Sequence, residues 1–101
     1  MSIYTITVPE LKAALEQNQP IELLDVRTIE KHQAFNIGGK HISLDDMPER
    51  YHELSKDKLI VTYCTTGNRS MRAVEYLLSL GFNQVKSLQG GMMAWQEMIF
   101  T

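Results

Sequence analysis

Short apolar runs recur along the chain and are separated by polar, turn-forming residues. The runs at 21–26 and 59–63 are typical of buried strands, and residues 85–88 predict a last strand. Residues 3–7 alternate between apolar and β-branched types and predict a further short strand, while residues 41–44 predict a short extended piece. The pattern therefore indicates five extended segments.

Between these segments, apolar residues return at the spacing of a helix face. Residues that commonly cap helices or end them bound these stretches. The predicted helices are one after the N-cap Thr7 that ends at Asn18-Gln19-Pro20, one from Thr28 to Ala34, one from Asp45 or Asp46 to Leu54, one from Ser70 to Leu80 with Gly81 after it, and one after Gly90-Gly91. In the last helix, Met92, Met93, Trp95 and Met98 recur at helical spacing and are expected to pack in the core.

The order of the segments predicts the fold class. Helices alternate with strands, which indicates an α/β domain whose mostly parallel sheet is covered by helices on both faces. The length of 101 residues predicts a single domain over residues 1–101. Catalytic loops of such sheets lie at the carboxyl ends of the strands. The two best strands end at Asp25-Val26-Arg27 and at Cys64, so these residues are the first candidates for a site.

Charge and cysteine content exclude several kinds of partner and site. The formal net charge of −2 gives no reason to expect nucleic acid or an acidic membrane as a partner. One cysteine cannot form an internal disulfide, and His32, His41 and His52 lack metal-ligand spacing, so no metal and no cofactor are expected. The N-terminal residues do not have the basic start and long apolar stretch of a signal peptide. Together these features predict a cytoplasmic protein.

Cys64 is the best candidate for chemistry. It directly follows an apolar run and lies just before an amphipathic stretch, so the order is strand, short polar loop, helix. A thiolate at this place meets loop N–H groups and the positive end of a helix, which lower the pKa of a cysteine and make it a nucleophile. The stretch 59–74 contains Arg69 and Arg72 but no acidic residue. The competing interpretation is a buried structural cysteine.

Four sequence blocks together are specific enough to indicate a family. The blocks are Leu24-Asp25-Val26-Arg27 with Glu30, Asn36-Ile37-Gly38-Gly39 leading to Ile42 and Leu44, Cys64-Thr65-Thr66-Gly67-Asn68-Arg69-Ser70, and Gly81-Phe82-Asn83-Gln84-Val85 followed by residues 88–95. On these blocks the chain resembles the single-domain rhodanese (thiosulfate sulfurtransferase) family, which implies a rhodanese-like fold with a five-stranded sheet. Two departures concern a surface loop near the site and bear on substrate preference. Residues 35–40 differ from the family's usual Gly-His-Ile-Pro-Gly-Ala, and the proline often found at Leu44 is missing.

The resemblance also implies roles for individual residues. It implies that Cys64 is the nucleophile and cycles through a persulfide, Cys–S–SH. It implies an anion cradle in the loop that follows, formed by Thr65, Thr66, Gly67, Asn68, Arg69 and Ser70. Asp25, Arg27 and Arg72 are candidate supporting residues. For Asp25 and Arg27, an ion pair that braces the fold is the alternative role, because a buried Asp must be paired or hydrogen-bonded.

Three functions remain open from the sequence. The first, implied by the resemblance, is transfer of sulfane sulfur from thiosulfate or a similar donor to cyanide or a thiol, such as a small thiol or a thioredoxin-like protein. The second is a phosphatase or arsenate reductase of related fold, but those enzymes separate their Cys and Arg by five residues, whereas Cys64 and Arg69 are separated by four. The third is a sulfur-relay or redox-sensing interaction module that acts with a protein partner.

Overall fold

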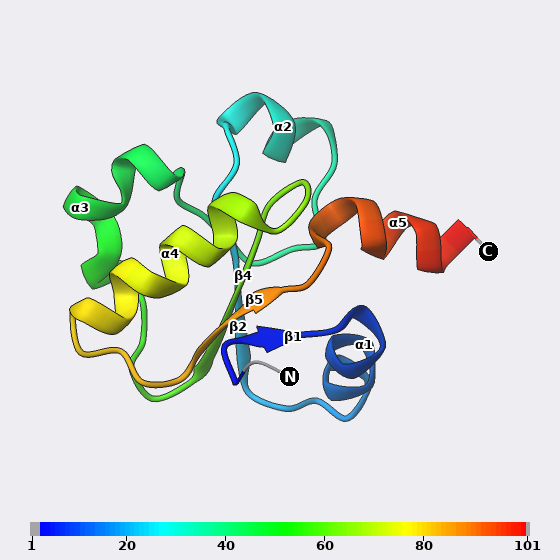
Figure 1. Cartoon of the computed structure of the whole chain (residues 1–101), viewed down its shortest axis with the longest axis horizontal. Helices are drawn as coiled ribbons and strands as arrows, with labels where there is room; N and C mark the ends of the chain where they lie inside the picture. The colour runs from blue at the N-terminus through cyan, green and yellow to red at the C-terminus, as the bar shows by residue number, and fades with distance from the viewer. Residues whose placement is uncertain (1–2, 101) are drawn as a thin grey trace.

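A sheet of five strands lies at the centre of the computed structural model, which describes residues 3–100 (Figure 1). The strands are β1 (Thr5–Ile6), β2 (Ile21–Asp25), β3 (Lys40–His41), β4 (Leu59–Tyr63) and β5 (Val85–Leu88). Their order across the sheet is β1-β5-β4-β2-β3, and each neighbouring pair is parallel. The carboxyl ends of the strands therefore lie at one end of the sheet, and β4 is the central strand. The predicted α/β class and parallel sheet are confirmed.

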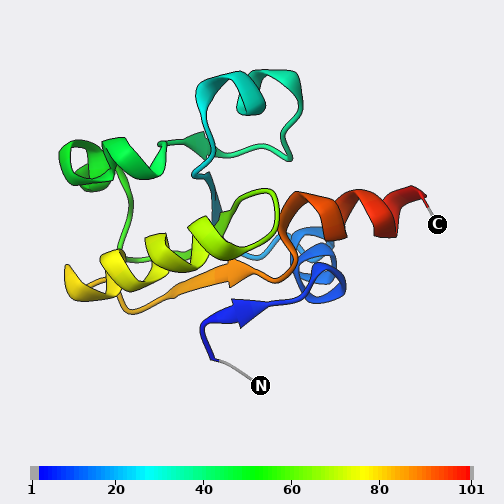
Figure 2. The ribbon, with the colours of Figure 1, turned by 45° about the horizontal axis from the view of Figure 1, so that its top comes forward.

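Helices cover both faces of this sheet (Figures 1 and 2). The helices are α1 (Val8–Glu16), α2 (Ile29–Ala34), α3 (Met47–Arg50), α4 (Asn68–Ser79) and α5 (Gly91–Phe100). On one face lie α3 and α4, and on the other lie α1 and α5, while α2 follows β2 at the carboxyl end of the sheet. Within residues 3–100, no helix is long and apolar enough to cross a membrane.

The side chains of β4 divide the core into two layers. Ile60 and Cys64 belong to the apolar cluster that contains Val74 of α4. Val61 and Tyr63 belong to the other cluster, with apolar residues of α1 and α5. This alternation follows from the period of two in a strand. It places the Cys64 side chain on the face that α4 covers.

The predicted N-caps of α1 and α2 are confirmed. Thr7 Oγ1 accepts a hydrogen bond from the Glu10 N–H at 3.2 Å, and the Glu10 carboxylate accepts one from the Thr7 N–H at 2.8 Å. These reciprocal bonds form a capping box, which satisfies two backbone donors at the helix start. At the start of α2, Thr28 Oγ1 accepts from the Lys31 N–H at 3.5 Å. Both helices therefore begin where local side-chain chemistry predicts.

Several element bounds differ from the predicted ones. β4 and β5 have the predicted bounds, whereas β1 is shorter than the predicted strand at 3–7. β2 ends one residue earlier than predicted, although the Val26 N–H still donates to the Tyr63 carbonyl at 3.1 Å. α4 begins at Asn68 rather than at Ser70, because Gly67 takes a φ of +108° and turns the chain directly into the helix.

The segment after β3 is more broken than the sequence predicts. The extended piece predicted for 41–44 ends early, and 3-10 turns at Leu44–Asp46 and Tyr51–Glu53 flank the four-residue α3. The Leu44 N–H donates to the Val26 carbonyl at 3.2 Å, so this segment is tied to the end of β2 instead of continuing as one helix. Asp46 occupies the position before α3 but makes no capping bond with its side chain.

The predicted core role of the α5 side chains is only partly correct. Met92 is buried and Trp95 packs against the second cluster. Met93 and Met98 are 58% and 38% exposed, so the prediction is wrong for them. The physical reason is that α5 contacts the rest of the molecule along one side, and its far end projects past the sheet (Figure 1).

Candidate active site

The sulfur of Cys64 lies at the base of the loop that joins β4 to α4. The Gly67 N–H donates to Sγ at 3.0 Å, and the Ser70 N–H donates to Sγ at 3.3 Å. The positive φ of Gly67 allows the loop to curl so that these groups converge on one atom. Cys64 is 3% exposed, so the sulfur is held by backbone donors in a largely buried position.

These contacts shift the pKa of the thiol. Burial raises the pKa of Cys64, but hydrogen bonds from the Ser70 hydroxyl, the Ser70 N–H, and the N–H groups of Gly67 and Thr66 lower it. The net effect is a pKa below the ordinary cysteine value. The start of α4 adds the positive end of a helix dipole at the same place. The predicted lowering of the Cys64 pKa is therefore confirmed in direction, which increases the share of thiolate relative to a free cysteine.

A cavity of about 260 Å³ opens at the sulfur. From the loop it is lined by Cys64, Thr65, Thr66, Asn68 and Arg69, and from the segment after β2 by Arg27 and Lys31. Three of these residues are cationic and none is acidic. The cavity is therefore suited to an anion that approaches the sulfur.

The structure brings most of the predicted site residues to this place, in two groups. Thr65, Thr66, Asn68 and Arg69 line the cavity, while Gly67 and Ser70 hold the sulfur. Arg27 reaches the cavity from the segment after β2, whereas Arg72 and Asp25 do not line it. Lys31 was not among the predicted residues. It reaches the cavity only through the packing of α2 at the end of the sheet, which leaves no signal in the sequence around it.

Behind the sulfur lies a group of buried hydroxyls. Ser70 Oγ lies 3.4 Å from Cys64 Sγ and 2.6 Å from Ser87 Oγ, and it can donate to the Gly67 carbonyl at 3.1 Å. Thr62 Oγ1 donates to the Ser70 carbonyl at 2.9 Å. A serine hydroxyl has one hydrogen. Ser70 can direct that hydrogen at the thiolate while Ser87 donates to Ser70.

Ser87 and Thr62 are positioning residues that sequence reasoning missed. They lie side by side because Thr62 of β4 pairs with Ser87 of β5 in the parallel register. Both are almost fully buried. The one available signal was a serine and a threonine inside strands that are otherwise buried, since buried hydroxyls need partners.

This arrangement predicts the pH dependence of Cys64 alkylation in Ser87→Ala. For the native protein, the rate of alkylation by iodoacetamide should rise with pH with a midpoint below about 8.5, the free-thiol value. In the native protein, Ser87 donates to Ser70 and leaves the Ser70 hydrogen free to bond the sulfur. Ser87→Ala removes this donor, so the midpoint should rise. Ser70→Ala, the matched control in the same chain of bonds, should raise it further. A midpoint that falls in Ser87→Ala would mean that Ser70 donates to Ser87 instead of to the thiolate.

The start of α5 holds the loop from its other side. The Met92 N–H donates to the Cys64 carbonyl at 2.8 Å, and the Met93 N–H donates to the Thr65 carbonyl at 3.0 Å. Figure 2 shows the start of α5 beside the turn between β4 and α4. Gly91 has a φ of +58°, and a Cβ at this position would lie 2.7 Å from the Thr65 carbonyl oxygen and would overlap the Cys64 carbonyl oxygen. This close approach requires glycine.

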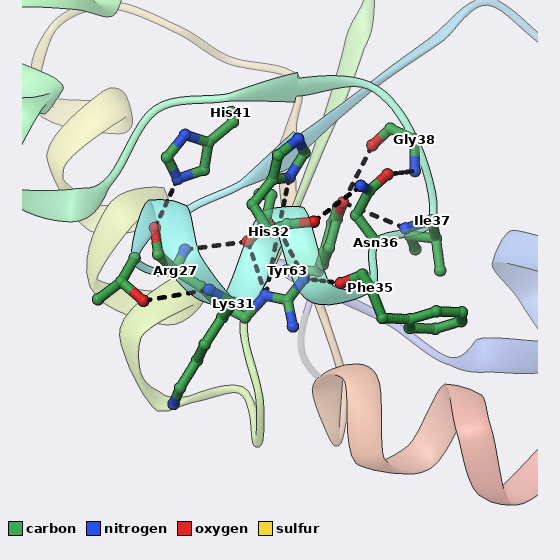
Figure 3. Close-up of polar contacts among 11 residues, drawn as sticks. Arg27, Lys31, His32, Phe35, Asn36, Ile37, Gly38, His41 and Tyr63 are labelled. Atoms are coloured by element: carbon green, nitrogen blue, oxygen red, sulfur yellow. Dashed lines mark hydrogen bonds and ion pairs between the residues drawn. The ribbon is translucent and has the colours of Figure 1, made fainter.

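Arg27 is fixed in place by a buried carboxylate. Its Nε and Nη2 donate to Asp25 Oδ1 and Oδ2 at 3.0 and 2.8 Å, and Nη2 also donates to the Phe35 carbonyl at 2.5 Å. Figure 3 shows Arg27 beside the Phe35 carbonyl, with His32 and His41 close by. Asp25 is fully buried and does not line the cavity, so its part is to orient Arg27. The bracing role considered for this pair fits Asp25, while Arg27 also faces the site.

Two histidines complete this cluster. His32 Nδ1 lies 2.9 Å from Asp25 Oδ2, and His41 Nε2 donates to the Arg27 carbonyl at 2.7 Å. Their rings stack with centroids 4.7 Å apart. Nothing in their spacing along the chain predicts this arrangement. Within residues 3–100, no three His, Cys, Asp or Glu side chains form a group that could hold a metal ion.

The Asp25 carboxylate is expected to contribute stability that depends on pH. Burial raises its pKa, but hydrogen bonds from Arg27 and His32 lower it, and the net pKa is below the ordinary value. A carboxylate with a lowered pKa in the folded state stabilises the fold above its unfolded pKa, and this stability is lost as the pH falls through the folded pKa. Asp25→Asn should therefore lower the unfolding free energy by about 2 kcal/mol at neutral pH, less than usual for a broken buried pair because one acceptor oxygen remains. The difference from the native protein should shrink below about pH 4.

Urea unfolding at neutral and acid pH measures this effect. Glu53→Gln is a matched control, because it removes a carboxylate from an exposed ion pair with Arg50, whose Nε lies 2.8 Å from Glu53 Oε2. The control should change the unfolding free energy little, since solvent screens exposed pairs. If both substitutions lowered the unfolding free energy equally, burial of the Asp25 pair would not be the cause of its contribution to stability.

Comparison with known proteins places this site in a family. A model of the rhodanese-like domain matches residues 7–98. YtwF of Bacillus subtilis is 39% identical over 97 residues, with 95% of this chain and 93% of YtwF covered. The thiosulfate sulfurtransferase GlpE of Tolumonas auensis is 30% identical over 98 residues, with 96% of this chain and 92% of GlpE covered.

Solved structures agree with this assignment. The crystal structure of a rhodanese-like domain protein from Staphylococcus aureus has a TM-score of 0.81 and 32% sequence identity, and the match covers 92% of this chain and 91% of that one. The parallel sheet, the loop that bears Cys64 and the sequence relationship all lead to the same result. The chain belongs to the rhodanese-like family, whose activity among its named relatives is sulfur transfer.

Proposed function

We propose that this protein transfers sulfane sulfur from thiosulfate or a similar donor to a thiol or cyanide acceptor through a persulfide on Cys64. The observation that carries the proposal is the Cys64 sulfur, held by two backbone N–H groups at the base of a cavity whose charged lining residues are all cationic. Such a sulfur is a nucleophile with its charge already stabilised.

In the first half-reaction, the Cys64 thiolate attacks the outer sulfur of thiosulfate. A bond forms between Sγ and the outer sulfur, the bond between the two sulfurs of thiosulfate breaks, and its electron pair leaves with sulfite. Arg27, Lys31 and Arg69 attract the donor dianion and the leaving sulfite. The Gly67 and Ser70 N–H groups then hold the Cys64 persulfide with no reorganisation of the loop.

In the second half-reaction, the acceptor removes the outer sulfur. Cys64 is the one cysteine in these 101 residues, so no second thiol of this stretch can take up the sulfur. The acceptor is therefore an external nucleophile: cyanide, a small thiol or a thioredoxin-like protein. Transfer to a protein thiol would make the same site part of a sulfur relay, without a change in its chemistry.

The loop directs its N–H groups at a single atom, which favours a sulfur donor over phosphate or arsenate as the substrate. Two N–H groups point at Sγ itself, four residues separate Cys64 from Arg69, and the Ser70 side chain closes the rear of the loop. A tetrahedral phosphate carries three equatorial oxygens that each need donors, and this requires a wider ring of N–H groups. Nucleic acid, membrane, metal and cofactor have no part in the proposed reaction.

The intact mass of the protein after incubation with thiosulfate tests the proposal. We expect a gain of one sulfur atom on Cys64, removed by cyanide or by dithiothreitol. The gain should fall as the pH is lowered through the Cys64 pKa, because the thiolate is the attacking form. An unchanged mass under excess donor at neutral pH would contradict the proposed function.

A further inference from the structure

A second cavity lies beside the Cys64 cavity. It measures about 280 Å³ and shares Arg27 and Arg69 with the first. Its other charged lining residues are Arg72 and Asp45, so three cations face one carboxylate. The two cavities are therefore neighbours joined by two arginines, and both favour anions.

Arg69 and Arg72 are available for a ligand. They are three residues apart on α4, which places them on the same side of the helix. Both are exposed. Among residues 3–100, neither side chain makes a hydrogen bond or ion pair with another residue, in contrast to Arg27, which is fixed by Asp25. Arg27 thus provides a fixed wall, and Arg69 and Arg72 provide exposed charge that no ion pair among the described residues neutralises.

The opposite wall of the second cavity comes from Ser43, Leu44 and Asp45. This is the segment in which the chain lacks the proline often found at Leu44 in similar sequences. The Leu44 N–H, which a proline would not have, donates to the Val26 carbonyl at 3.2 Å and ties the wall to the end of β2. One wall of the second cavity therefore includes Leu44, a position at which this chain departs from the family pattern.

We infer that the second cavity binds the carboxylate of the sulfur acceptor, so that the preferred acceptor is a thiol with an anionic group. This inference rests on the proposed function. Thiosulfate is small, and the first cavity already supplies Arg27, Lys31 and Arg69 for its charge. In this proposal the acceptor occupies both cavities, with its thiol at Cys64 and its carboxylate beside Arg72.

The chemical step for such an acceptor is balanced. The acceptor thiolate attacks the outer sulfur of the Cys64 persulfide, and a bond forms between these two sulfurs. The bond between Sγ and the outer sulfur breaks, and its electron pair returns to Sγ, which becomes a thiolate again. The first half-reaction leaves the persulfide as an anion, so the hydrogen on the transferred sulfur is the proton of the acceptor thiol, which moves to the outer sulfur as the acceptor thiolate forms. Arg72 takes no part in the bond changes and acts on the acceptor's position alone.

The test compares three small thiols that differ in charge: 3-mercaptopropionate, 2-mercaptoethanol and cysteamine. Protein loaded with persulfide by thiosulfate is mixed with each thiol, and the rate of persulfide loss is followed by intact mass. The quantity compared is the ratio of the 3-mercaptopropionate rate to the 2-mercaptoethanol rate. A change in the reactivity of the persulfide alters both rates equally and cancels in this ratio. Arg72→Ala should lower this ratio about two- to fivefold, the effect of one exposed charge pair. The corresponding ratio for cysteamine should not fall.

Two further variants sharpen the result. In Arg72→Lys, this rate ratio should lie between those of the native protein and Arg72→Ala, because a lysine keeps the charge but not the planar fork. Arg50→Ala is the matched control: Arg50 pairs with Glu53 and lines neither cavity, so the ratio should stay the same. An Arg72→Ala variant whose ratio equals that of the native protein overturns the inference while the proposed function stands. A native protein that gains no sulfur from thiosulfate rejects the proposed function itself, and the inference with it.

Discussion

Replacing Cys64 by serine is expected to abolish sulfur transfer completely. A serine hydroxyl is not ionised near neutral pH, so the N–H groups of Gly67 and Ser70 have no thiolate to stabilise. No other cysteine of the 101 residues can carry the sulfur in its place. The measurement is thiocyanate formation from thiosulfate and cyanide, together with the intact mass after thiosulfate alone.

The fold of Cys64→Ser should be nearly unchanged, which makes the activity loss specific. Serine is slightly smaller than cysteine, and the same backbone N–H groups can bond its oxygen, so the unfolding free energy should change by about 1 kcal/mol or less. Urea unfolding of the two proteins provides this control. Turnover in the serine variant close to the native level would eliminate Cys64 as the sulfur carrier.

Replacing Gly91 by alanine is expected to damage both stability and activity, although residue 91 does not line the cavity. The added Cβ would overlap the Cys64 carbonyl oxygen and lie 2.7 Å from the Thr65 carbonyl oxygen. Those oxygens accept the hydrogen bonds from Met92 and Met93, so relief of the overlap breaks the contact between α5 and the loop. The lost bonds, the overlap and the positive φ together should cost about 3 to 5 kcal/mol of unfolding free energy. A displacement of the sulfur by about 1 Å should slow transfer about a hundredfold.

Gly38→Ala is the matched control for backbone strain. Gly38 has a φ of +99°, but a Cβ there would meet no other atom within 4 Å. This variant therefore carries the strain of a positive φ without the overlap, and it should lose about 1 to 2 kcal/mol with transfer nearly intact. Urea unfolding and thiocyanate formation are measured for both variants. Equal losses would assign the Gly91 effect to backbone conformation and reject the contact with the loop as its cause.

The parts of the fold that local signals determine could be predicted from the sequence. The bounds of β4 and β5 and the caps at Thr7 and Thr28 agree with the structure, because apolar runs and capping side chains act within a few residues. The segment 45–54 was predicted less well. Its shape depends on a bond from the Leu44 N–H to the end of β2, which lies far away in the sequence.

In the site too, residues that are neighbours in the sequence could be predicted, whereas residues that the fold brings in from elsewhere could not. Cys64 and the loop up to Ser70 could be identified because strand, loop and helix are consecutive. Lys31 and Ser87 could not, since they reach the site through the position of α2 and through the parallel register of β5 with β4. The exposure of Met93 was also unpredictable, because helical spacing shows which residues share a side but not how much of the helix is covered.

The bonds from α5 to the loop have a consequence for how this protein can evolve. Both bonds use backbone N–H groups, so the geometry around Cys64 does not depend on which side chains residues 92 and 93 carry. An exposed side chain such as that of Met93 can therefore change without loss of these bonds, while the glycine at 91 must stay. In the descendants of such a gene, the surface of α5 can diverge to suit new neighbours of the protein, and the reactive sulfur is inherited intact.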